Sequence, residues 1–359
     1  MVNDENEKID ILREWLLKGK SRPYMIGIVP TEKCNLNCKY CDSGSKTKSN
    51  LIKDEISEKK LIQIIQEARI LGVKRIDITG SSEPFYNPNE AMNIIKAIRY
   101  NGMNGHVSTN GTLFTRRMIE TLVKLKFEGI SFGVDSADAQ THDYLRGQKN
   151  SFRKCIDAIK YLQLIKSTLN TTKPSVNVST VLVNKNYNTF RKTLLFLSKL
   201  NIDSWQIQDL MNTDNHPHYK ELQPNNSQII LFKTHLHSLK KMARKFNISI
   251  NLRHFINMGI IKESSNISNM YLGSSKYKFS AKCLAPWLAL VIHATGHIYV
   301  CEYNTRKSSI DTKSLEDIWI QDKYINDLRK EFINNHLPKF CSNCCTQTLR
   351  ENIKILKKL

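Results

Sequence analysis

The chain lacks the features that mark membrane-spanning, secreted and repetitive proteins. Its apolar run Leu284–Ile292 is far shorter than the roughly 20 residues that span a bilayer. The amino terminus, MVNDENEKID, carries acidic residues and no apolar segment, so we expect no secretory signal. No internal repeat or low-complexity stretch is evident, and 40% of the 359 residues are hydrophobic, enough for a sizeable core. These features predict a globular, cytoplasmic protein of about two domains.

Acidic residues are few compared with basic ones. Lys and Arg number 54 and Asp and Glu number 33, which gives a net charge of +21. Such an excess can attract nucleic acid or another anionic partner. The basic residues are nevertheless spread along the whole chain, and no motif interleaves them with aromatic residues. We therefore assign the charge to solvated surfaces and expect neither a nucleic-acid nor a membrane partner.

The nine cysteines are not expected to form a disulfide framework, because a secretory signal is missing. Eight of them fall into two clusters at opposite ends of the chain. Clustered thiols in a reducing compartment indicate metal or redox chemistry. The ninth, Cys155, lies in an amphipathic helical pattern and is predicted to be a small buried hydrophobic residue.

Residues 25 to about 210 alternate short β-rich runs with amphipathic helical patterns. Six strands separated by five helices imply right-handed βαβ units and a parallel sheet, which fits a doubly wound sheet and a partial barrel equally. The predicted strands are Tyr24–Pro30, Arg75–Thr79, Gly105–Thr109, Gly129–Asp135, Val176–Val183 and Ser204–Leu210, and the predicted helices are Ser57–Leu71, Asn89–Tyr100, Thr115–Leu125, Ser151–Ile165 and Asn188–Leu200.

The flanking segments predict further elements. An amphipathic helix ends at Gly19, a longer helix runs from about Ser227 to Phe246, and NISINLR is a possible strand. A hairpin turning at Thr295-Gly296 and a single helix over residues 314–332, with Ser314 as N-cap, follow the polar stretch Glu263–Ser275. We divide the chain into an N-terminal helix (1–24), a main α/β domain (25–225), a helical connection (226–280) and a small α+β domain (281–359).

The first cysteine cluster lies directly after the first predicted strand, as Cys34-x3-Cys38-x2-Cys41. Three thiolates within eight residues can reach one face of a cluster or an ion. Iron–sulfur clusters and structural zinc sites normally have four protein ligands. Three ligands leave one position open for an exchangeable ligand, and the alternative is a zinc site that takes its fourth ligand from elsewhere in the chain.

The spacing CxxxCxxC, with Tyr40 before the last cysteine, resembles the signature of the radical S-adenosylmethionine (SAM) superfamily. Further segments resemble that family in the same order. Thr79–Pro84 is similar to the family's GGEP segment, with two serines in place of two glycines. Ser108–Gly111 is similar to its S/T-N-G segment, and Ser131–Ser136 with His142–Gly147 to its S-x-D-G…HDxxRG pattern.

The resemblance implies a partial (β/α)6 TIM-type barrel and a catalytic [4Fe–4S] cluster that binds SAM at its open iron. Its ligands would be Cys34, Cys38 and Cys41. The resemblance implies that Tyr40 packs near the adenine, that short polar side chains face the ribose, and that a guanidinium pairs with the SAM carboxylate. The implied SAM contacts are Tyr40, Ser81, Ser82, Glu83, Ser108, Asn110, Ser131, Asp135 and Arg146.

The second cluster combines Cys283-x17-Cys301 with Cys341-x2-Cys344 and the adjoining Cys345. A four-cysteine zinc site is one interpretation of this pattern. The pattern also resembles the SPASM/Twitch extension of radical SAM enzymes, and Ser314–Trp319 is similar to the segment that follows there. Arg350 stands where a full SPASM domain has its next cysteine, which favours the shorter Twitch type. The resemblance then implies one auxiliary [4Fe–4S] cluster, held by Cys283, Cys301, Cys341 and Cys344, with Cys345 as a spare thiol.

The resemblance also implies the reaction. SAM would be cleaved to a 5′-deoxyadenosyl radical that abstracts a hydrogen atom from the substrate. An auxiliary cluster with four protein ligands would accept an electron, giving a net oxidation of a small sugar or aminocyclitol, as in Twitch dehydrogenases such as that of butirosin biosynthesis. A flavodoxin or ferredoxin would supply the reducing electron.

Three other functions remain open. The first is a peptide-modifying SPASM enzyme, although the 24 residues before the first strand are too few for a peptide-recognition domain. An RNA-directed radical SAM enzyme is favoured only by the net charge. A non-catalytic zinc-binding protein would leave the ordered SAM-like segments as coincidence.

Overall fold

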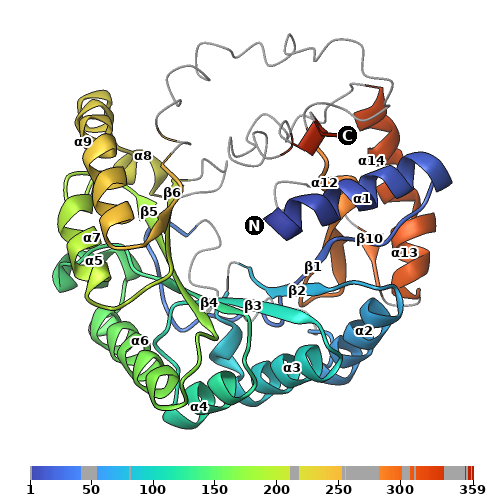
Figure 1. The fold of residues 1–359 in the computed structure, drawn as a ribbon, viewed down its shortest axis with the longest axis horizontal. Helices are drawn as coiled ribbons and strands as arrows, with labels where there is room; N and C mark the ends of the chain where they lie inside the picture. The colour runs from blue at the N-terminus through green and yellow to red at the C-terminus, as the bar shows by residue number, and fades with distance from the viewer. Residues whose placement is uncertain are drawn as a thin grey trace.

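The chain forms one curved sheet with helices packed along its outer side (Figure 1). The computed structural model describes residues 2–41, 55–80, 82–210, 218–252, 255, 283–300, 308–310, 313–334, 352, 355–356 and 358–359. Within these ranges the sheet has ten strands in the order β10-β9-β8-β1-β2-β3-β4-β5-β6-β7. The strands from β8 through β1 to β7 run parallel, whereas β9 is antiparallel to both of its neighbours, β8 and β10.

The six strands predicted between residues 24 and 210 are confirmed to within two residues at each end. The strands are β1 (Met25–Ile28), β2 (Arg75–Ile78), β3 (Asn104–Thr109), β4 (Gly129–Gly133), β5 (Ser175–Leu182), β6 (Ser204–Asp209), β7 (Ser249–Ile250), β8 (Ala289–Ile292), β9 (His297–Tyr299) and β10 (Ser308–Ser309).

The helices of the barrel follow the strands in alternation, and Figure 1 shows α2, α3, α4 and α6 along the outer edge of the sheet. The helices are α1 (Val2–Lys18), α2 (Glu58–Ile70), η2 (Pro84–Tyr86), α3 (Pro88–Tyr100), α4 (Arg116–Lys124), α5 (Ala139–Arg146), α6 (Ser151–Thr168), α7 (Phe190–Ser198), α8 (Tyr219–Leu222), α9 (Asn226–Lys245), α12 (Ala285–Leu288), α13 (Leu315–Gln321) and α14 (Lys323–Ile333). Strands and helices thus alternate along the chain, the helices cover the outer side of the sheet, and polar residues lie on its inner face. This is the mixed α/β fold of a partial TIM-type barrel.

Alternating hydrophobicity explains how the sheet acquires two different faces. In β5 every second residue is fully buried against the helices, while the intervening residues remain partly exposed on the other face. In β6 the two most buried residues, Trp205 and Ile207, are each 1% exposed, and Trp205 stacks on Phe190 of α7 with ring centroids 5.4 Å apart. The outer face therefore holds the apolar core, and the inner face is free to carry polar groups.

The carboxyl-terminal part of the chain continues the barrel sheet. β8 pairs in parallel with β1, with Ile26 beside Leu290 and Ile28 beside Ile292. The predicted hairpin is confirmed: β8 and β9 are antiparallel, and Gly296 in the turn has φ +77°. The sequence predicts the hairpin as part of a separate domain, whereas the observed sheet runs without interruption from the hairpin into the barrel.

The single helix predicted over residues 314–332 is two helices. Asp322 separates α13 from α14, and its carboxylate accepts hydrogen bonds from Tyr324 N at 3.0 Å and Ile325 N at 3.4 Å. The same carboxylate also pairs with Lys313 at 2.9 Å and with Ser308 at 2.7 Å. These contacts make Asp322 an N-cap, which ends one helix and begins the next.

Other differences are smaller. α5 and α12 were not predicted, and the predicted strand NISINLR shortens to β7. The polar stretch at residues 263–275 lies outside the described residues, so the division of the chain into four segments stays a prediction. No helix in the described part of the chain has the length and apolar character needed to cross a membrane.

Candidate active site

Three thiols lie in the loop that follows β1. Cys34, Cys38 and Cys41 are partly buried thiols that form no disulfide bond. Cys34 Sγ accepts a hydrogen bond from Leu36 N at 3.5 Å, and Cys41 N donates to Cys38 O at 3.1 Å. The pKa of the Cys38 thiol is raised to about 12, chiefly by burial and in part by the charges of Cys41 and Cys34. The three side chains therefore share one small, largely dehydrated region.

These thiols suit an iron–sulfur cluster better than a single metal ion. Within the described ranges, no three His, Cys, Asp or Glu side chains converge on one ion site. A four-iron cluster spreads its thiolate ligands over separate iron atoms, so ligands that stand apart are what it requires. Thiols that burial keeps protonated lose their protons on binding iron, because the metal charge outweighs the cost of burial. The residues present fit a cluster with three protein ligands.

Hydrogen bonds fix the first half of the cysteine loop to the segment after β3. Asn35 Nδ2 donates to Thr112 Oγ1 at 2.9 Å, and Asn110 Nδ2 donates to Asn35 Oδ1 at 2.9 Å. Asn110 Oδ1 in turn accepts from Thr112 N at 2.9 Å. The predicted SAM contact Asn110 therefore acts, in this structure, as a brace for the loop that carries Cys34.

The second half of the loop rests on the end of α5. Lys39 N donates to Leu145 O at 2.8 Å. Gly147 follows α5 with φ +63°, and a Cβ there would lie 2.1 Å from the carbonyl oxygen of Asn37. A side chain at Gly147 would therefore push the cysteine loop away from α5.

Tyr40, Asp135 and Arg146 form a buried group beside Cys38. Asp135 Oδ2 accepts from Tyr40 Oη at 2.8 Å and from Arg146 Nε at 2.7 Å. Gly133 makes room for the guanidinium, because a Cβ there would lie 2.1 Å from Arg146 Nη2. Burial alone lowers the pKa of Arg146, but the Asp135 carboxylate holds that pKa above its usual value.

The predicted roles of this group need one adjustment. The sequence places Asp135 at the ribose and Arg146 at the SAM carboxylate, whereas the structure pairs the two with each other. Nε of Arg146 is used by Asp135, so Nη1 and Nη2 are the atoms left to bind a carboxylate. A guanidinium held by one carboxylate and open on its other edge fits a second, incoming carboxylate. The SAM-binding role of Arg146 stays a prediction.

Both carboxylate oxygens of Glu83 accept hydrogen bonds from the protein. Oε1 accepts from Thr109 Oγ1 at 2.8 Å and from Phe85 N at 3.1 Å, and Oε2 accepts from Asn110 N at 2.7 Å. Burial raises the pKa of Glu83 to about 7, while these hydrogen bonds lower it. Glu83 therefore ties the segment after β2 to the end of β3, and its predicted contact with SAM is untested.

The serine that precedes Glu83 is the group that best fits an incoming ligand. Ser82 Oγ is buried and has no hydrogen-bond partner within the described residues. A buried hydroxyl without a partner costs free energy unless a ligand supplies one. The predicted contact Ser81 lies outside the described residues. Ser82 thus supports the expectation that the segment after β2 holds the polar end of SAM.

The inner face of β3 to β6 has a lower layer of polar side chains that bond to one another. His106 Nε2 and Ser131 Oγ are 3.1 Å apart. Ser204 Oγ donates to Asn177 Oδ1 at 2.6 Å, and Asn177 Nδ2 donates to Ser175 Oγ at 3.3 Å. Burial lowers the pKa of His106, which keeps its imidazole neutral near pH 7. Ser131, a predicted ribose contact, is thus already bonded to His106 in this structure.

A second set of inner-face side chains makes no hydrogen bond within the described ranges. Ser179 lies beside Gln206 and Val181 beside Gln208 in the register of β5 and β6, and both glutamines are exposed on the face opposite Trp205. On β3, Ser108 lies beside Ser131. We call this set the polar wall; its members are Ser108, Ser179, Gln206 and Gln208.

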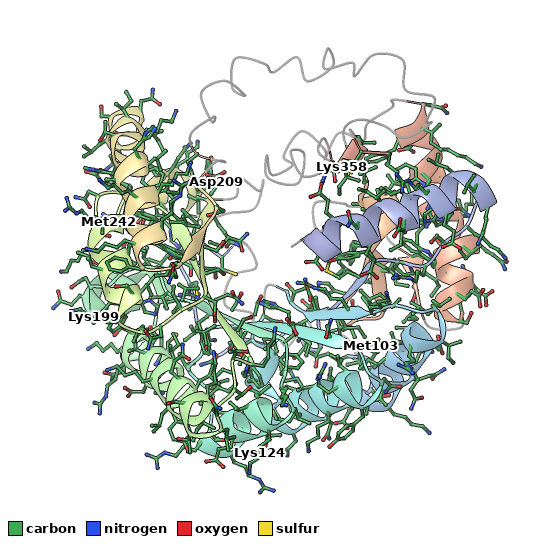
Figure 2. The ribbon with its side chains drawn as sticks, viewed as in Figure 1. Met103, Lys124, Lys199, Asp209, Met242 and Lys358 are labelled. Atoms are coloured by element: carbon green, nitrogen blue, oxygen red, sulfur yellow. The ribbon has the colours of Figure 1, made fainter. Side chains whose placement is uncertain are left out.

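Of the residues in the polar wall and in the layer below it, only Ser108 and Ser131 are predicted from the sequence to contact SAM. The signal for the others is the alternation of polar and apolar residues in SVNVS (175–179) and SWQIQD (204–209), which marks one face of each strand as polar. Asp209, labelled in Figure 2, lies at the end of β6, the last strand of that alternation.

The predicted auxiliary ligands can be followed only in part. Cys283 is partly buried just before α12, and its Sγ accepts from Ala285 N at 3.4 Å. Cys301, Cys341, Cys344 and Cys345 lie outside the described residues. The free Cys155 is fully buried, as predicted.

Comparison with known proteins agrees with this geometry. Residues 28–197 match the family model of the radical SAM superfamily, and residues 283–345 match that of an iron–sulfur cluster-binding domain, SPASM. An AdoMet-dependent heme synthase of Methanosarcina barkeri is 22% identical over 86% of this chain and 85% of its own length. The sporulation killing factor maturation protein SkfB of Bacillus subtilis is 27% identical over 37% of this chain and 31% of its own length.

The fold is shared with solved structures. The crystal structure of Streptococcus suis SuiB bound to S-adenosylmethionine has a TM-score of 0.65 and 18% identity, covering 90% of this chain and 72% of that one. The expected likeness to small Twitch dehydrogenases is not shown by these relatives and stays a prediction. SAM and two [4Fe–4S] clusters are the cofactors of this pair of domains. Residues 28–197 belong to the radical SAM superfamily, and an iron–sulfur cluster-binding SPASM domain follows them in the same chain.

Proposed function

We propose that this chain is a radical SAM oxidase of a small, polar, hydroxyl-rich substrate such as a sugar or an aminocyclitol derivative. The observation that carries the proposal is the polar wall. Its hydroxyl and amide side chains make no hydrogen bond within the described residues. They lie on the inner face of β3, β5 and β6, in the same sheet as β1, which leads into the cysteine loop, and β4, which leads into the helix that ends at Arg146.

The chemistry of the polar wall defines the substrate. Side-chain amides of Gln206 and Gln208 each offer donors and an acceptor, and the serine hydroxyls offer both as well. Such groups match substrate hydroxyl or amide groups and are left unpaired by an apolar ligand, which costs about 1–3 kcal/mol for each buried group. The charged pair on the inner face, Arg75 and Asp77, is already bonded at 2.8 Å. The wall therefore favours a ligand that is rich in hydroxyl or amide groups.

Each part of the chain has a separate task in this reaction. The bound SAM and first cluster supply a 5′-deoxyadenosyl radical, which takes one hydrogen atom from the substrate. Net oxidation then requires the substrate to lose one further proton and one electron. We propose that the electron passes to the auxiliary cluster, because four cysteine ligands leave no iron position for direct substrate binding. The polar wall orients the substrate, and a flavodoxin or ferredoxin is the proposed reductant of the first cluster.

The test uses reconstituted enzyme with SAM, dithionite and neutral sugar or aminocyclitol fractions. We expect substrate-dependent 5′-deoxyadenosine and a product two mass units lighter. Gln206→Leu and Gln208→Leu remove hydrogen bonds without removing bulk, so each should raise KM about 10-fold and leave substrate-free SAM cleavage unchanged. Gln63→Leu, on the exposed outer face of α2, is the matched control. Stimulation by acidic or apolar compounds alone, or unchanged KM values in both variants, contradicts the proposal.

A peptide substrate is the second candidate, and two observations favour it. SkfB is a maturation protein by name, and the net charge of +21 would attract an acidic peptide segment. The match to SkfB spans about a third of that protein, so the likeness reaches only part of its machinery. Stimulation of 5′-deoxyadenosine formation by acidic peptides, and by no neutral sugar, selects this candidate over the first. The name heme synthase is not carried over, because a polar wall suits a largely apolar macrocycle poorly.

A further inference from the structure

A group of polar residues joins the hairpin of β8 and β9 to the barrel, and it lies outside the active site described above. We call this group the junction. The junction begins with backbone hydrogen bonds. Val29 N donates to Ile292 O at 2.9 Å, and Ile56 N donates to Ala294 O at 2.7 Å. The end of β1 is therefore held by β8 at the point where the chain turns toward the cysteine loop.

Side chains extend this junction. Glu32 Oε1 contacts His293 Nδ1, and the Glu32 side chain is 11% exposed. The imidazole of His293 packs edge-on against the ring of Tyr299, with centroids 5.6 Å apart and an interplanar angle of 70°. Glu55 holds the same segment from the other side, because its Oε1 accepts from Glu32 N at 2.8 Å. Glu32 is thus fixed at both its backbone and its side chain.

The positions of these residues in the sequence place the junction next to the predicted ligands of both clusters. Glu32 lies two residues before Cys34, the first ligand of the SAM-binding cluster. Tyr299 lies two residues before Cys301, and His293 lies on the hairpin between Cys283 and Cys301. One contact, from Glu32 to His293, therefore connects a segment that leads into the first cluster with a segment that leads into the auxiliary cluster.

We propose that His293 is a positioning residue that couples the two cluster sites. Through Glu32 it fixes the direction in which the chain approaches Cys34, and its own position depends on a hairpin that the auxiliary cluster ligands hold. Loss of the auxiliary ligands then loosens the loop of the first cluster and weakens SAM binding there. Such coupling needs one physical link between two sites, and typical values are 5- to 150-fold in affinity.

A double-mutant cycle on the reconstituted holoenzyme tests the coupling. The clamp variant, Glu32→Leu with His293→Leu, removes both polar partners together and leaves no buried charge behind. It is combined with the auxiliary variant, Cys283→Ala with Cys301→Ala. The readouts are the SAM Kd from anaerobic equilibrium dialysis, the electron paramagnetic resonance spectrum of the reduced first cluster with and without SAM, and iron per chain.

In the wild-type background we expect the auxiliary variant to weaken SAM binding about 10-fold. In the clamp background it should weaken SAM binding less than about 2-fold, because the link is already broken. His293→Asn, whose side-chain amide nitrogen can take the position of Nδ1 and contact Glu32, should restore most of the coupling. His237→Leu, on the exposed face of α9, should leave it unchanged.

Equal effects of the auxiliary variant in both backgrounds overturn the coupling, as does an auxiliary variant that binds SAM normally. Should the clamp variant not fold, His293→Ala takes its place, because it removes the side-chain group that contacts Glu32. A wild type that carries no auxiliary iron overturns both this inference and the proposed oxidation. If both clusters are present and the effects of the clamp and auxiliary variants on SAM binding simply add, the coupling is overturned and the proposed oxidation is not.

Discussion

The barrel and the SPASM region bind their predicted clusters in opposite ways. In the barrel, three ligands lie within eight consecutive residues, and their loop is braced by Asn35 and Lys39. In the SPASM region, the four predicted ligands extend from Cys283 to Cys344. A local loop can form its site as soon as one strand and one helix are in place. A dispersed site forms only when several elements have already packed, so its integrity reports on the fold of the whole region.

The two regions also place their buried charges differently. In the barrel, Arg146 is buried and paired with the Asp135 carboxylate, close to the cysteine loop. In the SPASM region, Arg329 is 5% exposed and lies between Trp15 and Trp319, 4.3 and 4.6 Å from their ring centroids. Burial lowers the pKa of Arg329 to about 9, and its hydrogen bonds go to backbone carbonyls such as Pro286 O. Arg329 is therefore structural, whereas Arg146 is in a position to bind a ligand.

The largest effect is expected from removing one thiolate of the predicted cluster in the barrel. Cys38→Ala removes one of three thiolates from the first cluster, so SAM cleavage should fall at least about 100-fold. The measurement is 5′-deoxyadenosine formed per hour under reducing conditions. Cys155→Ala is the matched control, because Cys155 is buried but is not a predicted ligand. Cleavage at the wild-type rate in Cys38→Ala contradicts the ligand assignment.

The corresponding change in the SPASM region should have a narrower effect. Replacing Cys283 and Cys301 together should remove about four of eight irons and abolish oxidised product, while 5′-deoxyadenosine formation continues in part. The physical reason is that the substrate loses its electron acceptor while the first cluster remains. The measurement is the ratio of 5′-deoxyadenosine to product. A ratio that stays constant while both fall shows that the region serves folding alone.

Replacing Arg146 tests whether this arginine, unlike Arg329, binds a ligand. Arg146→Ala should weaken SAM binding about 10- to 150-fold while both clusters still assemble, because a charge-assisted pair is lost. The variant also leaves Asp135 buried without its cation, so a lower Tm is expected as well. Arg146→Lys keeps the charge near Asp135 and separates the two effects. A SAM Kd unchanged in both variants moves the carboxylate contact to another residue.

The smallest effect concerns pH. Burial lowers the pKa of His142 from 6.5 to about 4, and its Nδ1 accepts from Asp135 N. The neutral imidazole thus stabilises the fold above pH 6.5, and this contribution is lost as the pH falls from about 6.5 toward about 4, amounting to about 2 kcal/mol at pH 5. His142→Gln should therefore show a smaller fall in Tm between pH 7.5 and pH 5 than the wild type. The exposed His237→Gln should show the full fall, and equal falls in all three proteins refute the assignment.

The barrel could be predicted from sequence because its signals are local. Strand β5 was predicted within one residue at each end because polar and apolar residues alternate over its first five positions, and Ser57 and Thr115 begin their helices with side-chain caps. The break at Asp322 was not predicted, because its capping depends on packing with Ser308 and Lys313. The same limit applies to the site: the cysteine spacing was visible, whereas the pairing of Arg146 with Asp135 required the fold.

The parallel pairing of β1 with β8 has a consequence for how the chain matures. Met25 lies beside Ala289, so one edge of the first barrel strand stays open until more than 260 further residues have been added. An unpaired strand edge invites contact with other chains, and contacts between residues so far apart in sequence form slowly. A ribosome that stalls before residue 289 would therefore present a barrel with an exposed edge, and this enzyme depends on protection during its own synthesis more than a barrel closed by neighbouring strands would.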